Sequence, residues 1–155
     1  MKLSLPQIRA RYRDSVDDRE ETQALWRKLK EYQGDDGVLI AYQAATRILM
    51  SHHSWLPMEK LFYLKEAMAL FREAVRKAPD NVEVRFLRFS IEHSLPPYLG
   101  ESVNLADDKA AILQGLERYR DFALDEQELK AMLDFFESCE RFTEEELAQL
   151  RAVVK

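Results

Sequence analysis

Two arginines and a glutamate lie in an apolar segment near the middle of the chain. Arg85, Arg88 and Glu92 are separated by three and four residues, so on a helix they share one stripe. The same segment carries large apolar side chains at Phe86, Leu87, Phe89 and Ile91. A guanidinium among such residues is costly to bury unless its donors are paired. The segment therefore holds the first candidates for binding chemistry.

Two interpretations of these arginines stay open. In the first, which we favour, they bind carbonyl groups of the segment 95–100 or pair with Glu92 or Asp108, because buried arginines usually have partners. In the second, they line a cleft that holds the carboxylate of a partner, a group that suits the planar fork of arginine.

The histidines and the cysteine give weaker indications. His52, His53 and His93 match no spacing typical of a metal site, so we expect neither a metal nor a cofactor. Cys139 follows an apolar stretch, and a packed or half-exposed thiol is expected there rather than a nucleophile. A single cysteine also excludes an intramolecular disulfide. The sequence has no Gly-rich phosphate loop and no G-x-S-x-G elbow, so an enzyme is less expected than a protein without catalytic activity.

Aromatic residues are more numerous than a core of this size must hold. They include Trp26, Tyr32, Tyr42, Trp55 and Tyr98. Trp55 falls in a predicted loop, where it either closes the end of a helix bundle, which we slightly favour, or anchors a partner.

Composition places the chain among ordinary globular proteins. It has 155 residues, of which 46% are hydrophobic and 33% charged, with a net charge of -5 that argues against nucleic-acid binding. The first residues lack the apolar core of a signal peptide, and no apolar run is long enough to span a membrane. We expect a cytoplasmic protein, unless a leader has been removed.

The elements that position these residues are predicted to be six or seven helices, with no sheet. Capping signals occur at Asp80 with Glu83, at Asp125 with Glu128 and at Thr143 with Glu146. Gly34 is expected to end the second helix and Pro57 to open the fourth after a loop over 51–56. We expect one domain, divided into N-terminal helices (1–34), a central part (35–100) and C-terminal helices (101–155).

The fourth predicted helix, from Pro57 to about Ala78, is apolar on two sides. One stripe contains Leu61, Leu64, Met68, Phe71, Val75 and Ala78. Phe62, Ala69 and Leu70 lie off that stripe. A helix of this kind is expected to be central, with neighbours on both sides.

The end of that helix carries a recognisable motif. Ala67, Phe71, Ala74 and Pro79 form A-x3-F-x2-A-x4-P, which resembles the second helix of a tetratricopeptide repeat. The resemblance implies a right-handed stack of antiparallel helix hairpins. The segment 78–100, with P-D-N-V-E-V-R-F-L-R-F and P-P-Y-L-G, also resembles a family of small bacterial helical proteins, over about residues 35–120. That family implies no particular activity.

Together these patterns predict a protein-interaction or scaffold module. The expected partner-binding residues are Arg85, Arg88, Glu92, Tyr98 and Trp55, with a protein or peptide as the partner.

Two alternatives remain. One is a small-molecule-binding protein or enzyme with a pocket between the fifth helix and the 95–108 connection. The other is a homodimer, in place of a monomer, that pairs through Phe135 and Phe136.

Overall fold

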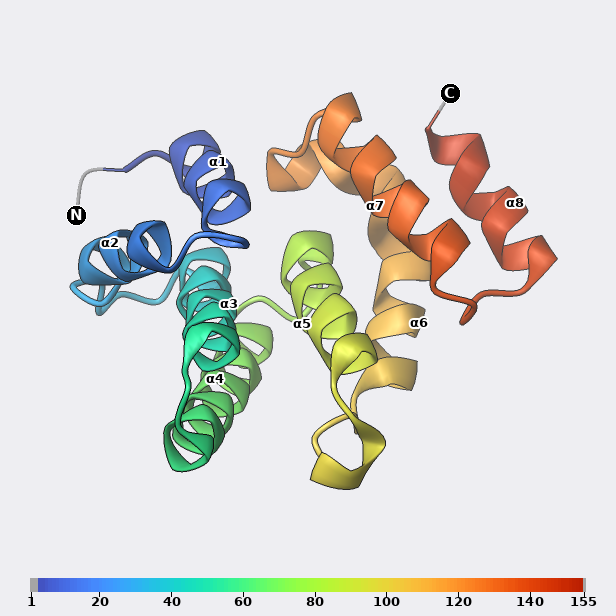
Figure 1. Ribbon diagram of the computed structural model, residues 1–155. Coiled ribbons are helices and arrows are strands. Elements are labelled where there is room, and N and C mark those ends of the chain that lie inside the picture. The colour runs from blue at the N-terminus through green and yellow to red at the C-terminus, as the bar shows by residue number, and fades with distance from the viewer. Residues whose placement is uncertain (1–2, 155) are drawn as a thin grey trace. The chain divides into compact units, whose positions relative to one another are not determined.

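The computed structural model describes residues 3–154, and its regular structure is helical (Figure 1). The eight α-helices are α1 (Leu5–Ser15), α2 (Arg19–Leu29), α3 (Gly37–His53), α4 (Pro57–Lys77), α5 (Val82–Ser94), α6 (Leu105–Gly115), α7 (Glu126–Ser138) and α8 (Glu144–Val153). Two short 3-10 helices, η1 (Pro97–Leu99) and η2 (Leu116–Phe122), complete them. Within the described residues there is no strand, so the all-α prediction is confirmed. The eight α-helices of the described residues exceed the predicted six or seven, and the short first and last helices begin with capping boxes at Ser4 and Thr143.

The chain folds as two compact units. The first unit contains α1 to α4 and ends at Pro79; the second begins at Asp80 and contains α5 to α8. The boundary thus falls inside the segment 35–100. Pro79, which cannot continue α4, marks it.

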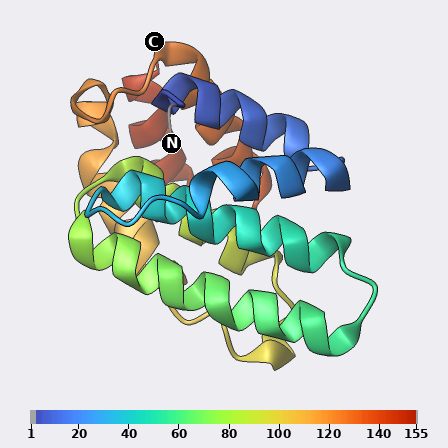
Figure 2. The same ribbon diagram turned by 90° about the vertical axis from the view of Figure 1, so that its left-hand side faces the viewer.

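In the first unit, α3 and α4 form the closest helix pair (Figure 2). They run in opposite directions and are joined by residues 54–56. Three residues of the A-x3-F-x2-A-x4-P motif, Ala67, Phe71 and Ala74, are completely buried. Gly37 at the start of α3 lies so close to α4 that a Cβ there would come within 2.6 Å of the Ala78 Cβ. Small residues therefore bring the two helices together.

Two helix ends differ from the predictions. Helix α2 ends at Leu29 rather than at Gly34, and the Gln43 amide donates to the carbonyl oxygens of Leu29 and Tyr32 at 2.8 and 3.0 Å. Helix α3 continues to His53, which shortens the predicted loop. The start of α5 is also shifted by one residue. Its N-cap is Asn81, not Asp80, because the Asn81 side chain accepts the Val84 N–H.

A partly buried tyrosine makes the first unit sensitive to alkaline pH. The rings of Tyr12 and Tyr42 meet edge to face, with centroids 5.6 Å apart. Burial raises the pKa of Tyr12 to about 12. Because the folded protein retains this proton longer than the unfolded chain does, the contribution to stability is complete below about pH 10 and is lost as the pH rises to about 12. We expect a loss of about 2–3 kcal/mol in the free energy of unfolding over that window.

Urea unfolding at a series of alkaline pH values measures this loss, with Tyr12→Phe as the matched control. The variant keeps the ring but has no phenolic proton, so its unfolding free energy should fall less steeply across the window. Equal slopes for the two proteins would contradict the prediction.

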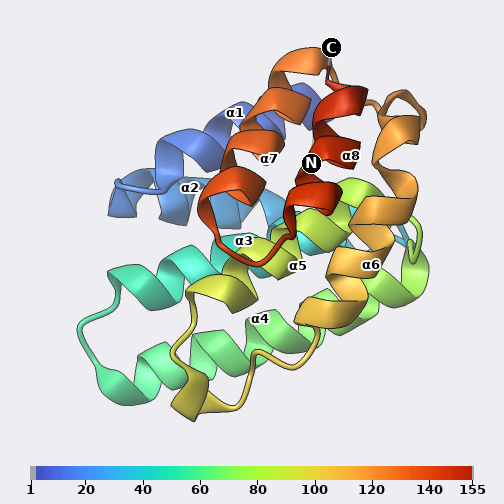
Figure 3. The same ribbon diagram turned by 90° about the vertical axis from the view of Figure 1, so that its right-hand side faces the viewer.

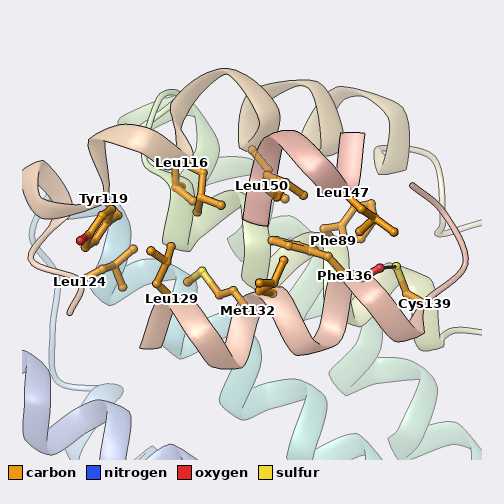
Figure 4. Packing of buried hydrophobic residues seen from close by; sticks show 13 residues of the cluster. Phe89, Leu116, Tyr119, Leu124, Leu129, Met132, Phe136, Cys139, Leu147 and Leu150 are labelled. Atoms are coloured by element: carbon orange, nitrogen blue, oxygen red, sulfur yellow. Dashed lines mark hydrogen bonds between the residues drawn. The ribbon is translucent and has the colours of Figure 1, made fainter. Parts of the chain in front are cut away.

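The second unit has its own apolar core (Figure 4). In Figure 1, α5 lies beside α6 and α7 beside α8. Residues from α5, α6, η2, α7 and α8 fill the interior between them. Phe136 is buried there, and Phe135 packs against Phe86 and Phe89, with ring centroids 5.6 and 6.2 Å apart. The side of α7 that we expected at a dimer interface is therefore largely occupied by this core.

Candidate functional site

The two arginines of α5 share one buried carboxylate on α6. The Arg88 guanidinium donates from Nε and Nη2 to the two oxygens of Asp108, both at 2.8 Å. Arg85 donates from Nη1 to Asp108 Oδ1 at 2.9 Å. Asp108 is fully buried, and Arg88 is nearly so. The bidentate geometry is the strong form of the arginine–carboxylate pair.

The third polar residue of the stripe, Glu92, binds the chain that leads into α6. Its carboxylate accepts the Asn104 backbone N–H at 2.8 Å and the Asn104 side-chain amide at 2.7 Å. The Ser102 hydroxyl donates to the Glu92 carbonyl oxygen at 2.7 Å. Because Asn104 is the N-cap of α6, Glu92 holds the beginning of that helix against α5.

Together these residues form a buried network of two cations and two anions. Burial raises the pKa of Glu92, while the hydrogen bonds from Asn104 and the charge of Arg88 oppose that rise. The charges of such a network sum to zero, and its donors are hydrogen-bonded to its acceptors. These interactions offset much of the desolvation cost of burying the charged groups. This arrangement corresponds to the first interpretation, in which Arg85 and Arg88 position the connection between α5 and α6.

Tyr98 lies apart from that network. It belongs to η1, in the connection that Figure 3 shows between α5 and α6, and its side chain is 86% exposed. Gly100, with a left-handed φ of 69°, ends this turn. A side chain so open to solvent does not line a deep pocket with the buried Arg88 and Asp108. The pocket expected between α5 and the 95–108 connection is therefore not formed by these residues.

Trp55 is also exposed, and it has apolar neighbours. Its side chain is 85% exposed in the turn between α3 and α4, so it does not close the end of a bundle as we had slightly favoured. Met58 and Phe62 of α4 are 82% and 60% exposed. The exposed large apolar side chains of this segment define what we call the hairpin tip: Trp55, Leu56, Met58, Leu61 and Phe62.

The hairpin tip corrects the prediction that α4 is covered on both sides. The inner stripe is covered from Leu64 onward, since Leu64, Met68 and Phe71 are buried, but Leu61 at its start is 45% exposed. On the second side, Phe62 is open to solvent. The spacing of apolar residues had revealed that side but not that it lacks a neighbour.

Polar contacts fix the backbone beneath the hairpin tip. The Ser54 hydroxyl donates to Glu59 at 2.5 Å and accepts the Leu56 N–H at 3.3 Å. The Lys60 ammonium donates to the Ser51 and His52 carbonyl oxygens at the end of α3, at 3.1 and 3.3 Å. The turn is therefore held from both helices, and its apolar side chains project from a fixed backbone.

The remaining sequence candidates make structural contacts. His53 lies beside Ser54 and Glu59 around a cavity of about 30 Å³, but its Nε2 donates to the Ser15 carbonyl oxygen at 3.2 Å rather than activating the serine. Cys139 is buried, as expected for a packed thiol. Among residues 3–154, no three His, Cys, Asp or Glu side chains are grouped so as to hold a metal ion.

His93 lies in the last turn of α5, where the helix dipole alone would favour a charged imidazole. Burial and the nearby Arg141 lower its pKa instead. Its Nδ1 accepts the Arg141 Nε at 2.7 Å, a contact that requires a neutral ring nitrogen.

A groove in the second unit is a site that the sequence did not indicate. It has a volume of about 570 Å³ and lies between α6, η2 and α8. Leu116, Tyr119 and Leu150 line it, and Gln114, Glu117 and Gln149 contribute polar groups. Helical periodicity shows only that these residues lie on partly apolar helix faces. Whether a groove forms between those faces depends on how the helices pack.

Comparison of the chain with protein-family models, with curated proteins and with solved structures found no match. Within residues 3–154, none of the helices is both long enough and apolar enough to cross a membrane.

Proposed function

We propose that the protein is an interaction module that contacts a protein partner through the hairpin tip. The observation that carries this proposal is the exposure of five large apolar side chains within eight consecutive residues, 55–62. Isolated exposed apolar residues are common on protein surfaces, but contiguous groups of them mark interaction sites. Tryptophan is among the residues most enriched where interfaces gain their binding energy.

The fixed backbone of the hairpin tip supports this proposal. A surface that is already ordered loses little conformational entropy when a partner binds. The hydrogen bonds of Ser54 and Lys60 provide such order beneath Trp55 and Met58.

We further propose that the first unit is tetratricopeptide-like. Its closely packed antiparallel pair α3–α4, the three-residue turn between them and the buried Ala67, Phe71 and Ala74 support that proposal. Helix hairpins of this kind present surfaces for protein contact. Arg85 and Arg88 remain a proposed second contact, but a partner carboxylate would have to compete with Asp108 for them.

Affinity capture followed by a binding measurement tests the proposed function. The full chain, the double variant Trp55→Ser/Phe62→Ser and the control Tyr98→Ser are each used to capture proteins from the native lysate. Tyr98 is a suitable control because it is as exposed as Trp55 but lies outside the hairpin tip. A captured protein is then purified and titrated against all three by calorimetry.

We expect the captured protein to bind the wild type and Tyr98→Ser equally and the double variant at least about tenfold more weakly. Equal binding of the captured protein by all three would contradict the role of the hairpin tip.

A second candidate function is the binding of a small molecule. The groove between α6, η2 and α8 favours it, because about 570 Å³ is within the usual range of ligand pockets and Leu116, Tyr119 and Leu150 line part of it. Its open form makes this the weaker candidate.

A further inference from the structure

We propose that the partner bound by the hairpin tip is a second copy of this chain. This inference depends on the proposed function, because it names the occupant of the same surface. It is supported by the geometry of the exposed side chains, by the charges around them and by their area.

The exposed residues of α4 lie on one face of two helical turns. Met58, Leu61 and Phe62 are spaced by three and four residues, which places them side by side. When two such helices pair in antiparallel fashion about a two-fold axis near Lys60, Met58 of each copy lies opposite Phe62 of the other. The surface is thus complementary to itself, as a two-fold dimer requires.

The two charged residues between Met58 and Leu61 do not oppose such pairing. Glu59 accepts the hydrogen bond from Ser54, and Lys60 donates to the carbonyl oxygens at the end of α3. The negative end of the α3 dipole partly balances the Lys60 charge. Two copies therefore bring apolar side chains together without leaving an unpartnered charge at the centre of the contact.

The exposed area suits a weak dimer. If all five residues are completely covered, each copy buries at most about 600–700 Å², somewhat below the roughly 800 Å² per partner of a standard interface. Such an area is larger than that of most non-specific contacts between proteins but smaller than that of an obligate dimer interface. We expect a dimer that dissociates at micromolar concentrations.

Sedimentation equilibrium of the full chain, from about 1 to about 500 µM, tests the proposal. The wild type and Tyr98→Ser should shift from monomer to dimer mass over this range. Trp55→Ser/Phe62→Ser should remain monomeric, with circular dichroism showing unchanged helix content, because both side chains lie largely in solvent. A wild type that stays monomeric, or a double variant that dimerises like the wild type, would overturn the proposal.

Photo-crosslinking separates failure of this inference from failure of the proposed function. A benzophenone amino acid replaces Met58 in the full chain, and the adducts formed in cells are identified by mass. A product of twice the chain mass, linked between hairpin tips, supports the dimer. Adducts only with a different protein overturn the dimer but leave the interaction module intact. Adducts only with lipid overturn both.

Discussion

Replacing Asp108 by alanine is expected to lower the free energy of unfolding by about 3–5 kcal/mol. Asp108 accepts hydrogen bonds from both Arg85 and Arg88, and its side chain is completely buried. Without the carboxylate, the Arg88 guanidinium is left inside the protein with unpaired donors. Removing one partner of a buried ion pair costs more than the pair contributes, because the remaining charge keeps its desolvation penalty.

Urea unfolding followed by circular dichroism measures this loss. The informative control is the double variant Arg88→Met/Asp108→Leu, which replaces the charged pair by apolar side chains of similar size. It should recover most of the lost stability, since apolar replacement of a buried pair is often neutral. If Asp108→Ala unfolds within about 1 kcal/mol of the wild type, the arginines have other acceptors and the network is not what joins α5 to α6.

This network also limits what Arg85 and Arg88 can do for a partner. A carboxylate from outside must displace Asp108, which already offers both oxygens to Arg88 at 2.8 Å. The displaced Asp108 would then be buried without its cations. The hairpin tip requires no such exchange, because its apolar side chains already face solvent. Because binding at the hairpin tip breaks no existing ion pair, the tip is the more favourable surface for a partner.

Much of the local structure follows from short-range sequence signals. The capping boxes at Asp125 and Thr143 and the first-turn proline at Pro57 are where the sequence predicts them. These signals act within four residues, so no distant part of the chain is needed to interpret them. The polar stripe of α5 is equally local, and Asp108 was already among its possible partners. The choice of Asp108, rather than Glu92 or nearby carbonyl groups, depends on how α6 packs.

The hairpin tip shows the opposite case. Apolar periodicity correctly marks both sides of α4, but periodicity carries no information about whether a neighbouring helix covers a side. Leu64 and Phe62 look equally suited to a core in the sequence, yet one is buried and the other is 60% exposed. Asn104, which donates to Glu92, likewise lies 12 residues away along the chain, in a connection whose sequence has no regular pattern. Both features depend on tertiary contacts, which single-sequence patterns do not specify.

Replacing Phe136 by alanine is expected to cost about 3–5 kcal/mol, an effect comparable to that of Asp108→Ala. Phe136 is almost completely buried on α7, and its ring lies 5.6 Å from Phe86 and 4.9 Å from Phe142, measured between centroids. The substitution removes apolar contacts and leaves a cavity among residues that come from several helices (Figure 4). Because these neighbours are held by their own helices, they can fill the space only in part.

Urea unfolding again provides the measurement, with Phe136→Leu and Tyr98→Ala as controls. Phe136→Leu keeps most of the apolar volume and should cost less than Phe136→Ala, while Tyr98→Ala should stay within about 0.5 kcal/mol of the wild type because Tyr98 is exposed. Equal losses for the two Phe136 variants would mean that ring packing, not cavity volume, determines the cost. A small loss for both would show that α7 is not an integral part of the second core, and that its aromatic face is free for the dimer contact which the sequence suggested.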